Sequence, residues 1–276
     1  MRFTVLGSGS TGNSVLITTE NTRVLVDAGL SAKQILLRLA EVGEDFEKLD
    51  GILITHEHTD HAGGLRVLLN TVRCPVYISD KTKDSYLRPK NGANGEKETR
   101  LRKNALKDTS ESIESDHGFS IGDIDFEPFS VPHDAADNFG FVANNRGVRL
   151  ATLMDFGHFT PLMKEKLKGC DAIVVESNHS IEMLRMCSIY SWELKQRISS
   201  DTGHISNEDL ARWLSEDYDG SARDIVLAHL SQKSNEPNLA KLSAEYALDS
   251  REPLFRSDTK ITLSRHDAPT PWLDYS

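Results

Sequence analysis

The chain has 276 residues, of which 38% are hydrophobic and 27% charged, and its formal net charge is −10. These values are ordinary for a globular enzyme with a sizeable core, and the negative charge argues against a protein that coats nucleic acid. No apolar run could span a membrane, the first residues are too polar for a secretory signal, and three cysteines lack a C-x-x-C spacing, so we expect a cytoplasmic protein without membrane contact.

The first part of the chain is predicted to form short β-strands joined by turns. Residues 2–6, 14–19 and 23–27 are rich in β-branched and aliphatic side chains. The turn at 7–13 contains G-x-G-x-x-G, but a dinucleotide site needs a helix to follow, and a β-prone segment follows instead. The turn is still rich in N–H and hydroxyl donors, so it could hold a phosphate through Ser8, Ser10 and Asn13.

A helix and a buried strand lead to the most informative motif. Residues 31–42 carry aliphatic side chains at helical spacing, and residues 51–54 are continuously apolar up to the strand end. The next seven residues, 55–61, place three imidazoles and a carboxylate in a small volume, and a turn that is histidine-rich by chance is a poor alternative. Such ligands suit zinc, and also iron or manganese. The sequence therefore predicts a metal site at His56, His58, Asp60 and His61.

A charged segment follows a short helix near 65–68 and a strand at 75–78. Residues 79–116 show little periodicity, which is typical of a surface insertion. A solvated loop would explain its charge, but a contact with a phosphate backbone is the sharper alternative. Between positions 81 and 107, three acidic residues are outnumbered by nine basic ones: Lys81, Lys83, Arg88, Lys90, Lys97, Arg100, Arg102, Lys103 and Lys107.

The remainder alternates strands and helices without a linker or a repeat. We therefore predict a single domain over residues 1–276, with a basic surface insertion around 80–116. Helices are expected from 181 to 199, from about 206 to 213, and around 239–247. Strands are expected at 124–129, 139–143, 148–154, 171–175, 225–228 and 260–264.

Metal-competent side chains repeatedly follow these strands. His133, Asp155 and His229 each come directly after an apolar run, and His179 stands close behind another. One such histidine is usually only a hydrogen-bonded surface residue, but the repetition favours a shared metal site. Asp27 closes the third strand, where a carboxylate could orient a ligand histidine.

The motif H-x-H-x-D-H and the strands around it resemble the metallo-β-lactamase superfamily over almost the full length. The resemblance implies an α/β (α+β) fold of the αββα type, in which two mixed sheets pack face to face between outer helices. It also implies two divalent ions, of zinc, manganese or iron. His56, His58 and His133 would bind one ion, Asp60, His61 and His229 the other, and Asp155 both, with Asp27 in support.

Further segments resemble the YycJ/WalJ-type exonuclease branch: GSGSTGN at 7–13, VPHDA at 131–135, ESNH at 176–179, GHISN at 203–207 and LAHLS at 227–231. That resemblance implies exonuclease action on double-stranded DNA. The run at 154–157 departs from the family's Thr-Asp-Leu-Gly-like pattern but keeps the bridging carboxylate Asp155. The basic insertion has no counterpart that we can match.

We therefore expect a dinuclear metal-dependent phosphodiesterase, with a DNA exonuclease that uses a metal-bridging hydroxide as the favoured case. Asp60 would accept the proton of the attacking water, and His204 and His179 would hold a neighbouring phosphate or protonate the leaving oxygen. Alternatively, these two histidines only bond loops near the site. Ser231 joins Ser8, Ser10 and Asn13 as a candidate phosphate contact.

Three other functions remain open from sequence alone. The same site could belong to an RNA-processing nuclease, or to a hydrolase of small esters, thioesters or lactones, because the fold does not fix the substrate. A metal-bound scaffold protein is the non-enzymatic alternative, but such proteins tend to lose ligands, and the motif here keeps every one.

Overall fold

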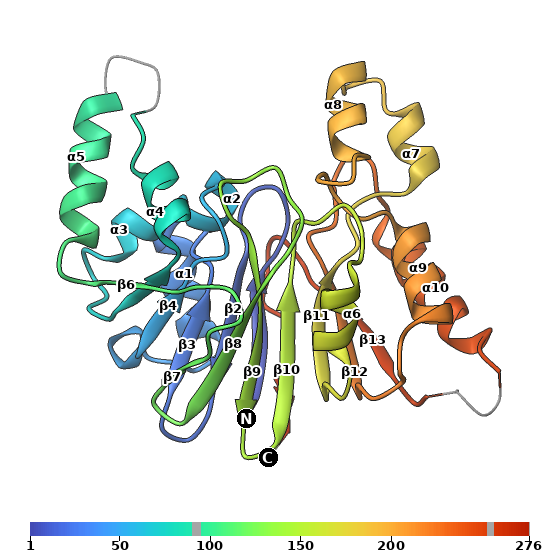
Figure 1. The fold of residues 1–276 in the computed structure, drawn as a ribbon, viewed down its shortest axis with the longest axis horizontal. Coiled ribbons are helices and arrows are strands. Elements are labelled where there is room, and N and C mark those ends of the chain that lie inside the picture. Colours follow the sequence, from blue (N-terminus) through green and yellow to red (C-terminus); the bar gives the residue numbers. More distant parts are fainter. Residues whose placement is uncertain (90–94, 253–256, 276) are drawn as a thin grey trace.

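Two β-sheets packed face to face organise the computed structural model, which describes residues 1–89, 95–252 and 257–275 (Figure 1). The first sheet contains, in spatial order, β14 (Leu273–Asp274), β1 (Arg2–Gly7), β2 (Ser14–Thr18), β3 (Arg23–Val26), β4 (Gly51–Leu53), β5 (Val76–Ile78) and β6 (Ser110–Ser112). The second contains β13 (Lys260–Leu263), β12 (Asp224–Ala228), β11 (Ala172–Glu176), β10 (Val148–Leu153), β9 (Phe139–Asn145), β8 (Ile124–Ser130) and β7 (Phe119–Ile121).

Both sheets are mixed, and helices cover their outer faces. Neighbouring strands in the runs β1–β2–β3 and β7–β8–β9–β10 pair antiparallel. Neighbouring strands in the runs β3–β4–β5–β6 and β10–β11–β12–β13 pair in parallel. The covering helices are α1 (Ala32–Glu41) and α3 (Leu65–Leu68) on the first sheet, and α6 (Pro161–Leu167), α9 (Asn207–Glu216) and α10 (Pro237–Asp249) on the second. The predicted αββα sandwich is confirmed.

The core explains why the central strands read as continuous apolar runs. Strands β2, β11 and β12 are buried along their whole length, because one face meets the opposite sheet and the other meets helices. The inter-sheet core joins side chains from both halves of the chain, such as Val5 and Val15 with Phe141 and Val174. The parallel strands β4, β10, β11 and β12 bring their carboxyl ends to one edge of the sandwich.

Helix boundaries follow local capping chemistry. The Ser31 side chain accepts a hydrogen bond from the Gln34 N–H and begins α1, which buries Ile35 and Leu39. The Ser206 side chain accepts a hydrogen bond from the Asp209 N–H and begins α9. Across the described ranges, no helix is long and apolar enough to cross a lipid bilayer.

The structure corrects two sequence expectations. Segment 79–116 is largely ordered into α4 (Asp80–Tyr86), α5 (Gly95–Leu106) and β6, although Lys90 and its neighbours to residue 94 lie outside the described residues. Helix α5 escaped prediction because it buries only Thr99 and Leu106, too few positions for a visible period. The helix expected at 181–199 is two helices, α7 (Ile181–Met186) and α8 (Trp192–Ile198), because Ser180 and Ser191 each cap a separate start.

Two helical projections stand at the same end of the sandwich. Helices α4 and α5 rise beside the first sheet, and α7 and α8 rise beside the second (Figure 1). The short helix α2 (Thr59–Ala62), which carries part of the metal motif, lies at this end too. A 3-10 turn (Phe46–Lys48) precedes β4 at the opposite end.

Candidate metal centre

The strands deliver the motif side chains to one place. His56 follows β4, His133 follows β8, Asp155 follows β10 and His229 follows β12. Asp155 and His229 adopt left-handed backbone conformations, with φ of 58° and 52°. Such values are uncommon outside glycine, and Asp and His are among the residues that tolerate them best. Both residues lie just after the end of a strand, and both belong to the candidate metal groups described below.

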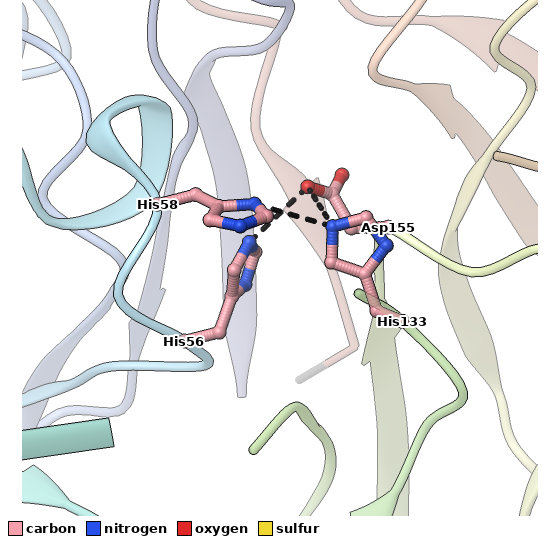
Figure 2. Close-up of side chains that lie close together, drawn as sticks. All are labelled: His56, His58, His133 and Asp155. Carbon is pink, nitrogen blue, oxygen red and sulfur yellow. Dashed lines mark hydrogen bonds and ion pairs between the residues drawn. The ribbon is translucent and has the colours of Figure 1, made fainter. Parts of the chain in front are cut away.

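The first candidate metal group consists of His56, His58, His133 and Asp155 (Figure 2). His58 Nδ1 lies 3.2 Å from His133 Nε2. Asp155 Oδ2 lies 3.3 Å from His56 Nε2 and 3.6 Å from His133 Nε2. These four side chains point their ligand atoms at a common centre.

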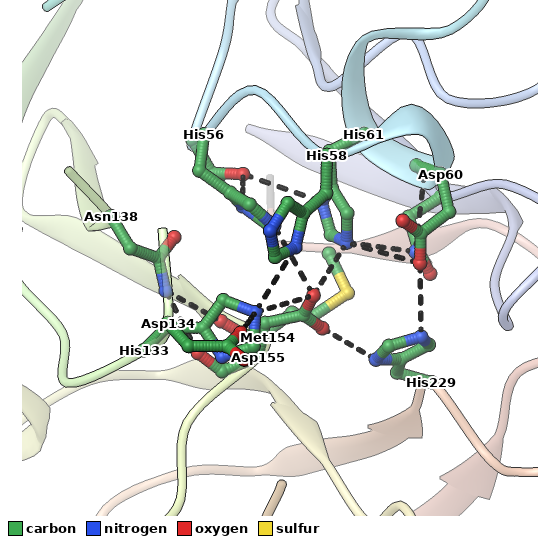
Figure 3. A network of polar contacts seen from close by, with 12 residues as sticks. His56, His58, Asp60, His61, His133, Asp134, Asn138, Met154, Asp155 and His229 are labelled. Carbon is green, nitrogen blue, oxygen red and sulfur yellow. Dashed lines mark hydrogen bonds and ion pairs between the residues drawn. The ribbon is translucent and has the colours of Figure 1, made fainter. Parts of the chain in front are cut away.

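The second group shares one of these carboxylates and consists of Asp60, His61, Asp155 and His229 (Figure 3). Asp155 Oδ2 lies 3.2 Å from His61 Nε2. Asp60 Oδ2 lies 3.4 Å from His229 Nε2 and 3.9 Å from His61 Nε2. The single oxygen Asp155 Oδ2 therefore borders both groups.

The spacing and the unpaired atoms of these residues fit a divalent cation. Metal–nitrogen bonds of about 2.0–2.1 Å in a tetrahedral arrangement separate neighbouring ligand atoms by about 3.3–3.4 Å, close to the spacings observed. His56 Nε2, His229 Nε2 and Asp155 Oδ1 are buried, form no regular hydrogen bond, and have charged groups of the same cluster as neighbours. Buried polar atoms are rarely left unsatisfied, so these atoms point to ions that belong between them.

Hydrogen bonds on the far side of the rings prepare the nitrogens for binding. His61 Nδ1 lies 2.6 Å from Asp27 Oδ2, His56 Nδ1 lies 3.0 Å from Thr55 Oγ1, and His133 Nδ1 lies 3.2 Å from the Gly203 carbonyl oxygen. A ring that donates its Nδ1 proton presents a lone pair at Nε2. Asp27, which is fully buried, lies on the far side of the His61 ring, and its role as a support for that histidine stays a prediction.

The charge distribution also favours a cation. Burial lowers the pKa values of His56, His58 and His133 below the usual value, so these rings are neutral and able to bind a metal. Burial opposes ionisation of Asp155, but the neighbouring His229 and His61 hold its pKa well below the ordinary value. Burial by itself would lower the pKa values of His61 and His229, yet Asp155 and neighbouring acids raise these pKa values well above 6.5. A bound cation would balance the negative charge of these carboxylates in place of the protons that His61 and His229 hold.

Asp60 is the most accessible acid of the second group. Its side chain is 22% exposed and lines a pocket of about 170 Å³ with His58, His133, Asp155 and His204. Burial would raise its pKa, but the close contact with His229 and the charge of His61 lower the pKa to about 2. Asp60 is therefore ionised at neutral pH and faces the space that a substrate would enter.

Of the four candidate phosphate contacts, one lines the pocket and three are buried in the structure. Ser10 is exposed and lines the pocket. Ser8 and Asn13 are buried and serve the loops instead: Ser8 Oγ donates to Asn13 Oδ1 at 2.7 Å and accepts from the His229 N–H at 2.8 Å. Ser231 is buried and accepts from the Ser234 N–H at 3.2 Å. We therefore carry only Ser10 forward as a phosphate contact.

The sequence analysis gave His204 and His179 the same possible roles, but their surroundings in the structure differ. His204 lines the metal pocket, and its Nδ1 lies 2.7 Å from Glu176 Oε1. His179 is buried, its Nδ1 has no hydrogen-bond partner, and it lines a separate groove between α7 and α8. Because His179 does not line the metal pocket, a catalytic role for it has no geometric support. The sequence placed it near a strand end but could not show the direction that the following loop takes.

Glu176 is a candidate site residue that the sequence analysis did not single out. Its buried carboxylate also contacts His229 Nδ1 at 2.9 Å and accepts a hydrogen bond from the Phe156 N–H at 3.0 Å. The signal was present, because Glu176 ends an apolar strand just as His229 follows one. With Asp155, His204 and His229 it forms a third set of ligand atoms within 4.8 Å of one another.

Comparison with known proteins defines the class first. Residues 22–230 match the family model described as the beta-lactamase superfamily domain, so the chain belongs to that superfamily. The solved structure of Zn²⁺-bound PqqB from Methylobacterium extorquens covers 100% of both chains with a TM-score of 0.70 at 16% identity, which supports the fold. The chain is a metal-dependent hydrolase of the metallo-β-lactamase fold.

Two relatives then narrow the position within the superfamily. Exodeoxyribonuclease YycJ of Bacillus anthracis is 38% identical over 261 residues, which cover 91% of this chain and 90% of the relative. Exodeoxyribonuclease WalJ of Streptococcus pneumoniae serotype 2 is 36% identical over 274 residues, which cover 98% of this chain and 96% of the relative. The predicted likeness to the YycJ/WalJ branch is confirmed.

Proposed function

We propose that the protein is a dinuclear metal-dependent DNA exonuclease. The observation that carries this proposal is the pair of ligand groups that share Asp155 Oδ2. The two relatives named exodeoxyribonucleases support DNA as the substrate, since each aligns over at least nine-tenths of both chains. All three cysteines are free, which supports a reducing, cytoplasmic location.

We assign the metal ligands as two sets joined by one residue. His56, His58 and His133 would hold one divalent ion, Asp60, His61 and His229 the second, and Asp155 both. Imidazole and carboxylate ligands suit zinc, manganese or iron. When bound, such ions would lower the pKa of water and neutralise charge on phosphoryl oxygens.

The side chains at the pocket wall would then manage the protons. Asp60, ionised and partly exposed, is placed to accept a proton from the attacking water. His204 uses Nδ1 to contact Glu176, so Nε2 is the nitrogen available to a substrate. Glu176 raises the pKa of His204 although burial opposes this, and a protonated His204 can give its proton to the leaving oxygen.

The test combines metal analysis with hydrolysis of end-labelled duplex DNA. We expect the purified protein to contain about two ions per chain and to release mononucleotides. Asp155→Ala should remove bound metal and abolish turnover without unfolding the chain, because the variant has no shared ligand. Asp249→Ala, which removes an exposed carboxylate at the end of α10, is the matched control and should change neither.

Other substrates decide between the alternatives. RNA, a small phosphodiester, a thioester and a lactone would be assayed with the same metal-loaded protein. Faster turnover of any of these than of DNA would contradict the proposed substrate. Full activity of Asp155→Ala would contradict the dinuclear centre.

A further inference from the structure

Helix α8 forms a wall between two hollows. On one side Leu194, Arg197 and Ile198 line the metal pocket. On the other side lies a groove of about 230 Å³ between α7 and α8, comparable in size to the metal pocket. We call it the α7–α8 groove; its lining residues are His179, Ile181, Leu184, Arg185, Trp192, Lys195, Gln196 and Ser199.

The groove has an aromatic side chain that nothing in the described fold covers. Trp192 is 68% exposed, whereas the two other tryptophans, Trp213 and Trp272, are buried or partly buried. Met186 and Ile189, in and after α7, are 75% and 71% exposed. Exposed large apolar side chains on and next to these two helices are a feature of binding surfaces.

Cations and an unsatisfied polar atom accompany the indole ring. Trp192 and Lys195 lie three residues apart and share one face of α8, and Arg185 lines the same groove from α7. His179, only 2% exposed, presents a buried Nδ1 that has no hydrogen-bond partner. A planar apolar surface, positive charge and a buried polar atom together match a nucleotide: a base can stack and hydrogen-bond while its phosphate meets the cations.

We propose that the α7–α8 groove binds an unpaired nucleobase of the substrate strand, stacked on Trp192, with Lys195 and Arg185 at the adjoining phosphates. This inference rests on the proposed nuclease function and names a subsite for it. A helix with its side chains is about 10 Å thick, and stacked nucleotides advance about 3.4 Å each. The groove therefore takes a base about three nucleotides from the phosphate held in the metal pocket.

The test uses the metal-loaded protein and a short phosphorothioate oligodeoxynucleotide that resists hydrolysis. Its affinity is compared with that of an abasic strand of the same length and charge. Stacking on an aromatic ring should make the wild type prefer the base-bearing strand by about tenfold to a hundredfold. Trp192→Ala should remove this preference, and Trp192→Phe should keep most of it. Tyr246→Ala, which removes an aromatic ring that is 77% exposed on α10, is the matched control and should keep it fully.

The outcomes separate this subsite from the proposed function. If Trp192→Ala keeps the wild-type preference while the wild type degrades DNA, the subsite is refuted and the nuclease function stands. If the wild type hydrolyses no nucleic acid, the proposed function fails by itself. If Trp192→Ala changes only the oligomeric state in size-exclusion chromatography, the exposed patch joins copies of this chain, and the subsite is likewise refuted.

Discussion

At the scale of single residues, backbone conformation places the ligands as firmly as side-chain packing does. Asp27, Asp155 and His229 all have left-handed φ values, of 64°, 58° and 52°, directly after strands. Asn138 Nδ2 donates to the Asp155 carbonyl oxygen at 2.8 Å and helps to hold that turn (Figure 3). Sparsely populated conformations of this kind persist where surrounding contacts fix them, and they concentrate at functional sites.

The role of His204 gives the residue-scale prediction. His204→Ala should keep both metals and the fold but lower kcat by about a hundredfold or more, the usual size of a general-acid contribution. Metal analysis beside steady-state kinetics on DNA measures both quantities. His158→Ala, which removes a histidine outside the metal pocket, serves as the control.

Two results would speak against this role of His204. Loss of metal from His204→Ala would make it a ligand or a support for one, through the third set that it forms with Asp155, Glu176 and His229. Unchanged kinetics with full metal content would leave it a structural residue.

At the scale of elements, the basic residues of α5 fall into two kinds, some exposed to solvent and one packed against α4. Lys97, Arg100 and Lys103 are exposed. Arg102 instead packs within the projection: its guanidinium lies 4.5 Å from the centre of the Tyr86 ring and donates to the Tyr86 carbonyl oxygen at 2.8 Å. Arg102 thus joins α5 to α4, and only the exposed three can meet a phosphate backbone while the packing stays intact.

The exposed face of α5 carries the second prediction. Replacing Lys97, Arg100 and Lys103 by glutamine should weaken DNA binding, because fewer phosphates are neutralised. The slope of log affinity against log salt should fall by about 0.9 for each phosphate that the variant no longer neutralises. Binding isotherms at several salt concentrations measure this slope. The helix itself should persist, because none of the three is buried.

A matched charge change distinguishes a local contact from a general field. Replacing Lys48, Arg73 and Arg146 by glutamine removes the same charge from exposed positions that precede β4, β5 and β10, away from the strand ends that carry the site. This control should leave the salt slope unchanged. Equal effects of both triple variants would contradict a specific contact at α5.

At the scale of the whole molecule, the sequence predicted what depends on local pattern. The H-x-H-x-D-H motif is contiguous, and His133, Asp155 and His229 each follow an apolar strand, so all seven proposed ligands were visible. The contact between Glu176 and His204 was not visible, since it exists only when the end of β11 meets the loop that precedes α9. Strand β14 is two residues long and pairs with β1 across the entire chain, which leaves no local signal.

The core and the metal groups both support the prediction of one domain. The inter-sheet core joins β1, β2 and β3 to β8, β9, β10 and β11. The first and second metal groups likewise combine the motif at 56–61 with residues from beyond position 130. We therefore propose that residues 1–276 fold as a unit in which metal binding and folding are coupled, since the ligand sets exist only when both halves are in place.

Removal of metal should therefore lower the melting temperature in a single step. An ion that binds only the folded chain at a hundred times its Kd adds about 2.7 kcal/mol, so two such ions add about 5.4 kcal/mol, and about 2–4 °C of melting temperature per kcal/mol gives about 11–22 °C for this chain. Circular dichroism and tryptophan fluorescence, recorded with metal and after chelation, should report the same transition, because the core spans both halves. Asp155→Ala should melt at one temperature under both conditions. Two separate transitions would contradict the single domain, and a melting temperature indifferent to chelation would contradict a metal centre that stabilises the fold.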